Sequence, residues 1–481
     1  MSTFIAGSEA YPTIAAAMAP AIGGDTIQLM SGYGSEAATV NLQNLLFTGD
    51  ASSTNVVLTL GSGIGNLRLG GLAPINVNDN AGNNTITGNG GANLFHVMAG
   101  NDVIHGGGGV DRLVIDYSAV TSTITGTVTS VTDGATHSVL FDGVENFTIT
   151  TGAGNDTITT ANGDNLISTA GGDDTITVGN GHDNIMAGLG NDTVSAGDGG
   201  DFVDGGEGNN TITTGLGQDT VLTGAGNDTI ITGGGADLTT VAGGVDTVNS
   251  GDGNDLLTVN YANSTTDVTG SMSSGSFAIG YSGVVADVAG NSVTFQNTES
   301  FNITTGSGND TITTGDRNDT ITGGAGNDIL SGGGGSDTIR GNQGSDIIHG
   351  GAGNDVLFGG QGADHIFGDQ GSDVMTGGEN NDTFVFDSLT ASFNGAPDLI
   401  TDFSPGDRID LSAIDADTSV GGDQAFHVGG GGGHAGDIVA TYDAGNDRTV
   451  LSLYVDNNGS VDSTIWLTGN HVGIAAGDFI L

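Results

Sequence analysis

Aspartate recurs at every ninth residue over much of this chain, and that spacing is the feature most able to do chemistry. One run comprises Asp310, Asp319, Asp328, Asp337, Asp346, Asp355, Asp364, Asp373 and Asp382, most of them preceded by Gly-x-Gly or a near variant. Glycine permits the φ > 0 backbone of a tight turn, and aspartate and turn carbonyls supply the hard oxygen ligands that Ca²⁺ prefers. The pattern predicts a repeated metal site.

The same nine-residue register holds in two earlier blocks. The middle block places its candidate ligands at Asp156, Asp174, Asp183, Asp192, Asp201, Asp219, Asp228, Asp237, Asp246 and Asp255, with asparagine at 165 and 210. A weaker block has Asp102 and Asp111, preceded in the register by Asn84 and Asn93. Because asparagine carries no negative charge, we expect the first coils to bind metal poorly or not at all.

Two segments, Gly-Gly-Ala-Gly-Asn-Asp-Ile-Leu-Ser (323–331) and Gly-Gly-Ala-Gly-Asn-Asp-Val-Leu-Phe (350–358), resemble the nonapeptide of the RTX family. The resemblance implies that two nonapeptides form one coil and that each turn stacks on the turn eighteen residues later. A Ca²⁺ ion would then be shared by pairs such as Asp310 with Asp328, or Asp337 with Asp355. Several calcium ions would run down each edge of the solenoid.

Apolar residues follow each candidate ligand by two positions and should form the core. In the middle block they are Ile158, Ile167, Ile176, Ile185, Val194, Val203, Ile212, Val221 and Ile230. A disordered Gly/Asp-rich tail has no reason to keep that spacing. We therefore expect an all-β fold, in which a right-handed parallel β-helix with a short amino-terminal capping helix merges into a calcium-binding parallel β-roll.

The composition limits the partners. The chain has 481 residues and a formal charge of −50, with no cysteine and no lysine. This charge disfavours nucleic acid and anionic membranes as partners, and no apolar run is long enough to span a bilayer. Self-repulsion also disfavours a compact metal-free state, so folding should depend on calcium.

The chain contains an internal duplication. The segments 111–160 and 255–314 share Ser-Val-x-Phe and a later Glu-x-Phe-x-Ile-Thr-Thr-Gly-x-Gly-Asn-Asp-Thr-Ile. We therefore expect a capped β-helix over 1–80, weak repeats over 81–116, an insert of longer strands over 117–150, a β-roll over 151–258, a duplicated insert over 259–305, a second β-roll over 306–383 and a carboxy-terminal module over 384–481.

The last segment resembles the carboxy-terminal module of serralysin-type proteases, through Thr-Phe-Val-Phe (383–386), the acidic segments 398–411 and 456–462, Gly-Asp-Gln-Ala-Phe (422–426) and the terminal Asp478, Phe479, Ile480 and Leu481. The resemblance implies an uncleaved signal for the type I secretion machinery. It places the protein outside the cell, or on the surface, of a Gram-negative bacterium.

Motifs of the related secreted enzymes are absent. No histidine is followed by Glu in HExxH, no serine lies in G-x-S-x-G, and the Tyr-Gly-x-Asp-Pro-His signature of calcium-repeat epimerases is missing. We therefore expect no enzyme. A polysaccharide epimerase or lyase remains an alternative, in which Asp116, Asp133, Asp142 and Glu145 converge on one coil surface.

Two faces of the predicted solenoid are distinctive. Threonine follows every second ligand, at Thr157, Thr175, Thr193, Thr211, Thr229 and Thr247, as in ice-binding solenoids and in ordinary β-sheet surface. On the opposite face the outward residues include Leu166, Met186, Phe202, Leu222, Leu238 and Leu256, a candidate interface.

These features predict a secreted, calcium-dependent structural protein that assembles with itself into a surface layer or extracellular sheet. The alternatives are a monomeric adhesin that binds cell-surface polysaccharide through the inserts, the polysaccharide-modifying enzyme, and an ice-binding protein.

Overall fold

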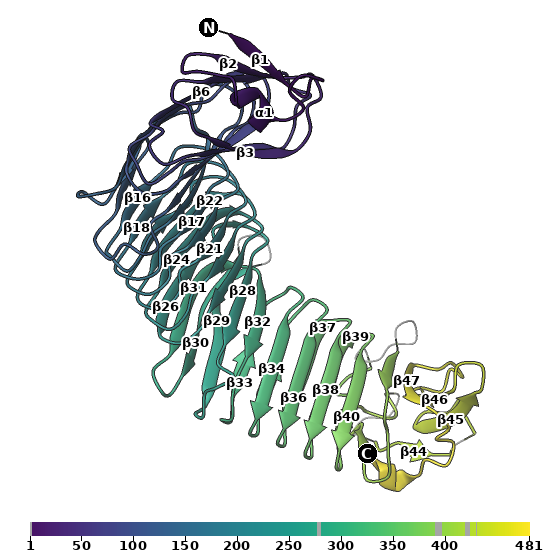
Figure 1. Cartoon of the computed structure of the whole chain (residues 1–481). Coiled ribbons are helices and arrows are strands. Elements are labelled where there is room, and N and C mark those ends of the chain that lie inside the picture. Colours follow the sequence, from purple (N-terminus) through teal and green to yellow (C-terminus); the bar gives the residue numbers. More distant parts are fainter. Residues whose placement is uncertain (1, 277–279, 390–396, 419–423, 430) are drawn as a thin grey trace. The chain divides into compact units, whose positions relative to one another are not determined.

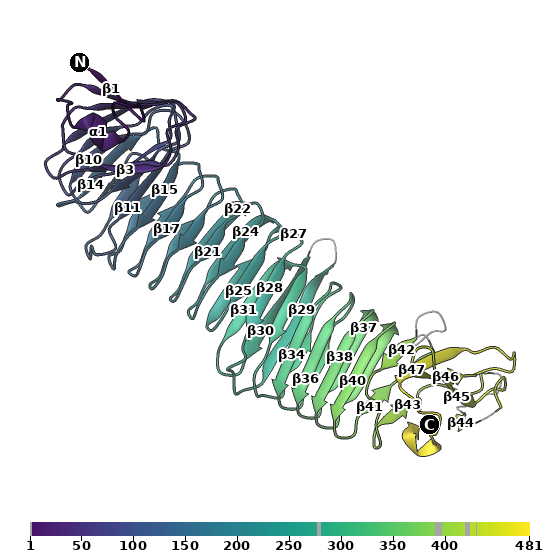
Figure 2. The same cartoon turned by 45° about the vertical axis from the view of Figure 1, so that its right-hand side comes forward.

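The computed structural model describes residues 2–276, 280–389, 397–418, 424–429 and 431–481. The chain divides into two compact units, Met1–Gly235 and Ala236–Leu481. Over the described residues, helix is confined to α1 (Ile14–Met18) and the short 3-10 helix η1 (Ala476–Asp478), and the remainder is strand and turn. The expected all-β fold is confirmed, and the strands stack as successive rungs within each unit (Figures 1 and 2).

The first unit has two sheets. Sheet A contains β1 (Thr3–Ala6), β2 (Thr26–Leu29), β4 (Leu46–Gly49), β6 (Asn66–Gly71), β8 (Thr85–Thr87), β10 (Asn101–His105), β12 (Thr125–Thr127), β13 (Ser130–Thr132), β14 (Ser138–Asp142), β16 (Thr157–Thr159), β18 (Thr175–Thr177), β20 (Thr193–Ser195), β22 (Thr211–Leu216) and β24 (Thr229–Gly235). Sheet B contains β3 (Glu36–Val40), β5 (Val56–Leu60), β7 (Ile75–Asn78), β9 (Leu94–Val97), β11 (Arg112–Asp116), β15 (Asn146–Thr150), β17 (Leu166–Ser168), β19 (Asn184–Met186), β21 (Phe202–Asp204) and β23 (Thr220–Leu222).

The second unit repeats this plan. Its part of sheet A contains β26 (Val245–Asn249), β27 (Asp252–Gly253), β29 (Val268–Ser276), β30 (Gly280–Asp287), β31 (Ser292–Thr298), β33 (Thr311–Thr313), β35 (Ile329–Ser331), β37 (Ile347–Gly353), β39 (His365–Gly371), β41 (Thr383–Val385), β43 (Arg408–Asp410) and β48 (Phe479–Ile480). Its part of sheet B contains β25 (Leu238–Val241), β28 (Leu256–Asn260), β32 (Ser300–Thr304), β34 (Thr320–Ala325), β36 (Thr338–Gln343), β38 (Val356–Gln361), β40 (Val374–Glu379), β42 (Asp398–Ile400), β44 (His427–Val428), β45 (Asp437–Asp443), β46 (Arg448–Leu453) and β47 (Ser463–Thr468).

Parallel pairing joins each repeat strand to the strand one coil further along the chain. Ile158 is the register partner of Ile176, and Ile339 is the partner of Leu357. Both pairs are eighteen residues apart, which confirms two nonapeptides per coil. Strand side chains alternate between the two faces of a sheet, so every second residue points inward.

The predicted core is confirmed. Ile158, Ile167, Ile176, Ile185, Val203, Ile212, Val221 and Ile230 are fully buried, and Val194 is 2% exposed. Burying such a side chain contributes about 1.5 to 3 kcal/mol each relative to leaving it in water. This internal column holds the turns, and therefore the aspartates, in register.

The expected amino-terminal helix is present as α1. Thr13 caps it by accepting a hydrogen bond from the amide of Ala16, 3.1 Å away. Ile14 and Ala17 are buried, and the carboxylate of Glu36 on β3 accepts a hydrogen bond from the amide of Ile14 at 3.0 Å. The helix is therefore fixed to the first coil.

Both predicted inserts contain a three-stranded antiparallel meander. In the first unit β12, β13 and β14 pair in antiparallel order, and β14 then pairs in parallel with β10. In the second unit β29, β30 and β31 do the same, and β31 pairs in parallel with β26. The two copies thus share a topology as well as a sequence pattern. The domain boundaries given above remain predictions.

Candidate metal centres

Each nonapeptide is numbered here so that the candidate ligand is position 6, which makes Gly323 position 1 of the repeat that contains Asp328. Positions 2 and 4 are the glycines with left-handed φ, for example Gly324 at 102° and Gly326 at 128°. They make the sharp turn that brings the backbone back toward position 6. The turn is therefore built by local sequence, and the strand that follows anchors it to the core.

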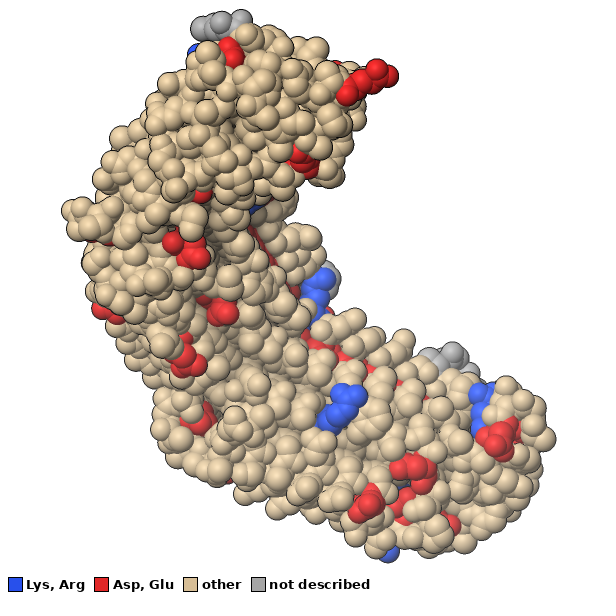
Figure 3. Space-filling view, in the orientation of Figure 1, with Lys and Arg blue, Asp and Glu red and all other residues tan. Residues whose placement is uncertain are grey.

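The repeat aspartates are buried rather than displayed. Those from Asp328 to Asp382 are at most 1% exposed. Although the chain carries a formal charge of −50, most of the surface seen in Figure 3 is neither acidic nor basic. Many of the negative charges of this protein thus lie inside its turns.

One carboxylate oxygen of each aspartate links neighbouring coils. The amide of Asp328 donates to Oδ1 of Asp346 at 2.8 Å, and the amide of Asp346 donates to Oδ1 of Asp364 at 2.8 Å. On the other edge, Asp337 and Asp355 make the same bond at 2.8 Å. Asp156 and Asp174 form the corresponding pair in the first unit, at 2.7 Å. Each of these candidate ligands is thus hydrogen-bonded to the candidate ligand of the next coil, eighteen residues further along the chain.

The second carboxylate oxygen, Oδ2, has no hydrogen-bond partner in many of these turns. This holds for Asp102, Asp111, Asp156, Asp174, Asp183, Asp192, Asp201, Asp255, Asp310, Asp328, Asp337, Asp346, Asp355, Asp364, Asp373 and Asp382. A buried acceptor without a partner costs about 1 to 3 kcal/mol, and more when it is charged. Either a proton on the carboxyl or a cation in the turn would remove this cost.

Burial raises the pKa of these carboxyls. The loss of water raises the pKa of Asp337 to about 8 and that of Asp328 and Asp364 to about 7. In the first unit it raises the pKa of Asp201 to about 7 and that of Asp174 to about 6. A bound cation would restore the ionised form, because it replaces the lost hydration with direct coordination.

Glycine at position 1 lets Oδ2 approach the backbone. A Cβ atom added to Gly341 would collide with Oδ2 of Asp346 and lie 2.8 Å from the carbonyl oxygen of Gly359 in the next coil. Equivalent neighbours recur at Gly332 and Gly350. The unpartnered carboxylate oxygen and a backbone carbonyl of the next coil therefore lie together beside position 1, where only glycine fits.

The donor set of this space fits Ca²⁺. Among the described residues, no three His, Asp or Glu side chains cluster closely enough to hold a metal ion. Backbone carbonyls must therefore complete the coordination shell, and carboxylate and carbonyl oxygens are the ligands of Ca²⁺. When bound, the ion would supply the positive charge that Oδ2 of the aspartate lacks, and this oxygen and backbone carbonyls would hold it.

Asparagine changes the turn. The side-chain amide of Asn84 donates to the carbonyl of Ile64 at 2.6 Å, and that of Asn93 to the carbonyl of Ile75 at 2.9 Å. Asn165 donates to the carbonyl of Gly163 at 2.8 Å. An N–H donor thus occupies carbonyls that could otherwise coordinate a cation, and weak metal binding by the asparagine coils remains a prediction.

The remaining predicted ligands occupy the same turns. Asp219, Asp228, Asp237, Asp246 and Asp319 are all at most 2% exposed. Sequence reasoning missed four further residues that continue the rows. Glu145 accepts from the amide of Asp111 at 2.8 Å and Glu299 from that of Asp255 at 2.9 Å. Asp398 and Asp407 accept from Asp373 and Asp382 at 2.8 and 3.0 Å.

These additions had weak signals in the sequence. Glu145 and Glu299 occupy equivalent places in the two duplicated segments, and Asp398 and Asp407 are themselves nine residues apart. The inserts and an extended connection break the nine-residue count before each of them. Spacing alone could not place them opposite the repeat aspartates.

The six apolar residues predicted as one stripe do not form a single row. Leu166 and Phe202 share a row with Asn184 and Thr220. The single row is therefore absent from the first unit, because polar residues separate the apolar ones within each row, and the interface itself remains a prediction.

Met186 and Leu222 lie two positions further along their strands, in a row with Ser168 and Asp204. In the second unit, Leu238 and Leu256 are direct register partners. Met186 is 38% exposed. The threonine row is regular by contrast, since Thr157, Thr175, Thr193, Thr211 and Thr229 are successive partners and all exposed.

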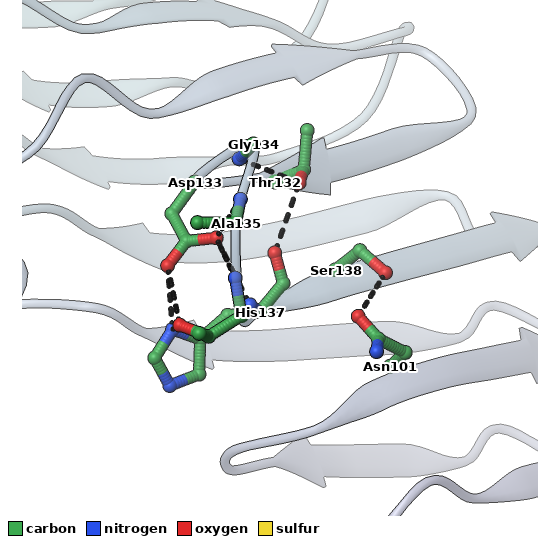
Figure 4. Close-up of polar contacts among 8 residues, drawn as sticks. Asn101, Thr132, Asp133, Gly134, Ala135, His137 and Ser138 are labelled. Carbon is green, nitrogen blue, oxygen red and sulfur yellow. Dashed lines mark hydrogen bonds and ion pairs between the residues drawn. The ribbon is translucent and has the colours of Figure 1, made fainter.

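The four carboxylates considered for catalysis are engaged separately. Asp133 accepts a hydrogen bond from the amide of His137 and lies 2.7 Å from its Nδ1 (Figure 4). Asp142 lies 2.9 Å from Nδ1 of His105, and Glu145 bonds to the repeat turn of Asp111. Asp116 accepts from the amide of Ser118 at 3.0 Å. The structure shows no acid and base pair among them.

The terminal motif is part of the fold. Asp478 ends η1, while Phe479 and Ile480 form β48, which pairs with β43. Phe479 is 5% exposed, and the carbonyl of Ile480 accepts from the amide of Leu411 at 2.9 Å. Leu481 follows β48. Gly422 and Asp423 of the Gly-Asp-Gln-Ala-Phe motif (422–426) lie outside the described residues.

Known proteins share the repeats. The family model described as RTX calcium-binding nonapeptide repeat (4 copies) matches residues 78–113, 148–176, 177–212, 204–239, 240–258, 304–339, 331–366, 340–375 and 349–384. Metalloprotease AprA of Pseudomonas entomophila is 41% identical over 88 residues, which are 18% of this chain and 18% of the relative. The chain therefore matches only a small part of that relative.

Solved structures give weaker matches. Two subunits of a mannuronan C5-epimerase from Azotobacter vinelandii are each 28% identical, with TM-scores of 0.22 and 0.23, and cover 34% and 35% of this chain and 78% and 91% of their own. Extracellular lipase LipA from Serratia marcescens is 18% identical with a TM-score of 0.19, over 62% of this chain and 45% of the lipase.

Proteins with this repeat are typically secreted, and none of the helices in the described part of this chain is long and apolar enough to cross a membrane. The residues that the family model matches include the turns whose position-6 aspartates are buried. On these grounds residues 78–113, 148–258 and 304–384 of the chain consist of RTX calcium-binding nonapeptide repeats.

Proposed function

We propose that this is a secreted structural protein that folds on calcium outside the cell and then assembles with itself into a surface layer or extracellular sheet. The observation that carries the proposal is the repeated turn in which Oδ2 of a buried aspartate has no partner and lies, with a carbonyl of the next coil, beside a glycine at position 1. Such a turn is costly when empty and favourable when a cation fills it.

Export and folding follow from the same turns. In a calcium-poor cytoplasm the charge of −50 and the unpaired buried carboxylates from Asp328 to Asp382 oppose the compact state of the last repeats, so folding of the whole chain would be completed only after passage through a type I secretion system. Outside the cell, calcium would join each coil to the next. The docked terminal strand β48 shows that the segment resembling a secretion signal becomes part of the folded module.

Assembly would use the outward faces of the sheets. The apolar residues of sheet B are mostly half buried, and they alternate with polar ones, which suits a mixed contact surface. Leu238 and Leu256 provide an adjacent apolar pair in the second unit.

The test is negative-stain microscopy of the full chain, kept first in chelator and then raised through millimolar calcium, with circular dichroism on the same samples. Sheets or filaments that appear together with β structure support the proposal. Replacing Phe202 and Leu238 by serine should abolish assembly and leave calcium-induced β structure intact, whereas Thr175→Ser on the threonine row should change neither. Dispersed particles at every calcium concentration would exclude self-assembly.

A second candidate is a polysaccharide-binding surface protein, favoured by a cavity of about 770 Å³ beside the first insert. Its lining includes Asp79, His96, Tyr117 and His137 together with Met98. Oδ2 of Asp79 and the hydroxyl of Tyr117 are buried without a hydrogen-bond partner. Sugars bind to such combinations of hydrogen-bonding groups and apolar walls.

A glycan array probed with the calcium-loaded chain tests this candidate. Specific binding that Tyr117→Phe weakens, with the circular dichroism spectrum unchanged, would support it. Absence of binding to every acidic and neutral glycan on the array would exclude it.

A further inference from the structure

Position 1 divides the nonapeptides into two classes. Glycine occupies position 1 before aspartate at Gly323, Gly332, Gly341, Gly350, Gly359, Gly368 and Gly377, and once earlier at Gly106 before Asp111. Over residues 151–230 the same position is held by Thr151, Thr160, Thr169, Val178, Ala187, Ala196, Thr214 and Thr223, and the one glycine, Gly205, precedes an asparagine. The aspartate at position 6 is common to both classes.

At position 1, glycine is required because neighbouring atoms leave no room for a Cβ, and not because of its backbone conformation. None of the seven position-1 glycines from Gly323 to Gly377 has a left-handed φ. A Cβ added at Gly350 would collide with Oδ2 of Asp355 and lie 2.8 Å from the carbonyl of Gly368. A side chain there would therefore take the place that faces both oxygens.

Threonine does take that place in the other class. The hydroxyl of Thr169 donates to the carbonyl of Ala187, in the next coil, at 2.6 Å, and it lies close enough to Asp174 to lower the pKa of that carboxyl against the larger effect of burial. Thr314 donates to the carbonyl of Gly332 at 2.8 Å in the same way. In these turns the hydroxyl satisfies the carbonyl that a cation would otherwise bind, whereas the buried hydroxyls of Thr151, Thr160 and Thr223 have no hydrogen-bond partner and these side chains only occupy the position.

Aliphatic side chains and asparagine close the remaining turns. Val178, Ala187 and Ala196 are at most 4% exposed, so their side chains fill the position-1 space. In the turn of Asn165, Thr160 is buried, and the amide of Asn165 donates to the carbonyls of Ala161 and Gly163 at 3.5 and 2.8 Å. None of these turns combines an aspartate with an open position 1.

We propose that calcium binds only the turns that combine glycine at position 1 with aspartate at position 6, and that the coils of residues 151–230 are closed by their own side chains and form without metal. This assignment rests on the proposed calcium-dependent function and specifies which turns bind the ions. The coils of residues 151–230 then provide a preformed scaffold, and the coils of residues 323–382 are the part that folds when calcium binds. The aspartates from Asp156 to Asp228, which resemble ligands in sequence, serve there as acceptors that join coils through Oδ1.

A matched pair of substitutions in the full chain tests the assignment. Asp346 and Asp174 both accept a backbone amide through Oδ1 at 2.7 to 2.8 Å, and both lie in turns that lead into sheet A. Aspartate to asparagine keeps the shape of the side chain, and asparagine already occurs at position 6 of this chain. The measurement is calcium bound per chain, by equilibrium dialysis against buffered calcium with metal analysis.

We expect Asp346→Asn to lower the bound calcium and Asp174→Asn to leave it unchanged. Gly341→Thr, which introduces the closing side chain, should lower it as Asp346→Asn does. An equal loss in Asp174→Asn and Asp346→Asn would overturn the assignment. A wild-type chain that binds no calcium would instead overturn the calcium-dependent function on which the assignment rests.

Hydrogen exchange followed by mass spectrometry gives a second readout that does not depend on the variants. In chelator, the amides of β16, β18 and β20 should stay protected while those of β36, β38 and β40 exchange, and calcium should protect the second set. Full exchange of both sets in chelator, or equal protection of both, would contradict a division between the two classes of turn.

Discussion

Acidification should stabilise the calcium-free coils of residues 323–382, because their buried aspartates are easier to fold once protonated. Burial raises the pKa of Asp337 to about 8, of Asp364 to about 7 and of Asp355 to about 6, from an ordinary value of 3.8. Between 3.8 and the raised pKa, the folded chain binds more protons than the unfolded chain. The free energy of unfolding must then fall as the pH rises.

The size of the effect follows from the shift. Over the pH range in which one such aspartate is protonated only in the folded chain, it changes the free energy of unfolding by about 1.4 kcal/mol per pH unit. The stabilisation is complete below the unfolded pKa and is lost as the pH passes through the folded pKa. Several aspartates titrate together here, so a step of one pH unit near neutrality should change the calcium-free fold measurably.

Circular dichroism in chelator from pH 8 to pH 5 is the assay, with light scattering to exclude precipitation. We expect β structure and the urea midpoint to increase on acidification. Calcium should reverse the sign, since protons compete for the same carboxylates, and the calcium midpoint should move to higher concentration at pH 5. Calcium-free β structure that declines from pH 7 to pH 5 without precipitation would refute the reasoning.

Two further substitutions test the core and the turns. Ile212→Ala should lower the free energy of unfolding by about 2 to 5 kcal/mol, since Ile212 is fully buried, whereas Thr211→Ala on the exposed face should change it by no more than about 0.5 kcal/mol; equal urea midpoints for the two variants would contradict the assigned core. Gly353→Ala should weaken calcium-induced folding, because φ is 140° and the added Cβ would collide with the carbonyl of Gly335. At Gly334 the nearest atom would lie 3.4 Å away, so Gly334→Ala should fold at the calcium concentration of the wild type.

The nine-residue spacing was sufficient to predict the fold. It placed Ile158 and its counterparts inward and the turns eighteen residues apart, because a period that repeats over many coils leaves only one consistent register. The meander of each insert could not be predicted, since no short-range pattern distinguishes an antiparallel excursion from an enlarged coil. The supposed apolar stripe failed for a related reason: a shift of two residues along a strand moves a side chain into the neighbouring row.

The candidate site divides in the same way. Position 6 could be assigned from spacing alone, and its burial follows from the turn. Whether a turn has room for an ion depends on position 1 and on the next coil, eighteen residues away. The significance of Thr169 in place of glycine appears only when its hydroxyl is seen on the carbonyl of Ala187.

The coils of residues 323–382 are proposed to fold only when calcium binds, and this is the central claim. The most direct measurement is hydrogen exchange of β35 to β40 in the full chain as calcium is raised from chelator to millimolar concentration. Protection that appears cooperatively with calcium and is reduced in Asp346→Asn is the predicted result. Equal protection of these strands in chelator and in calcium would contradict the claim.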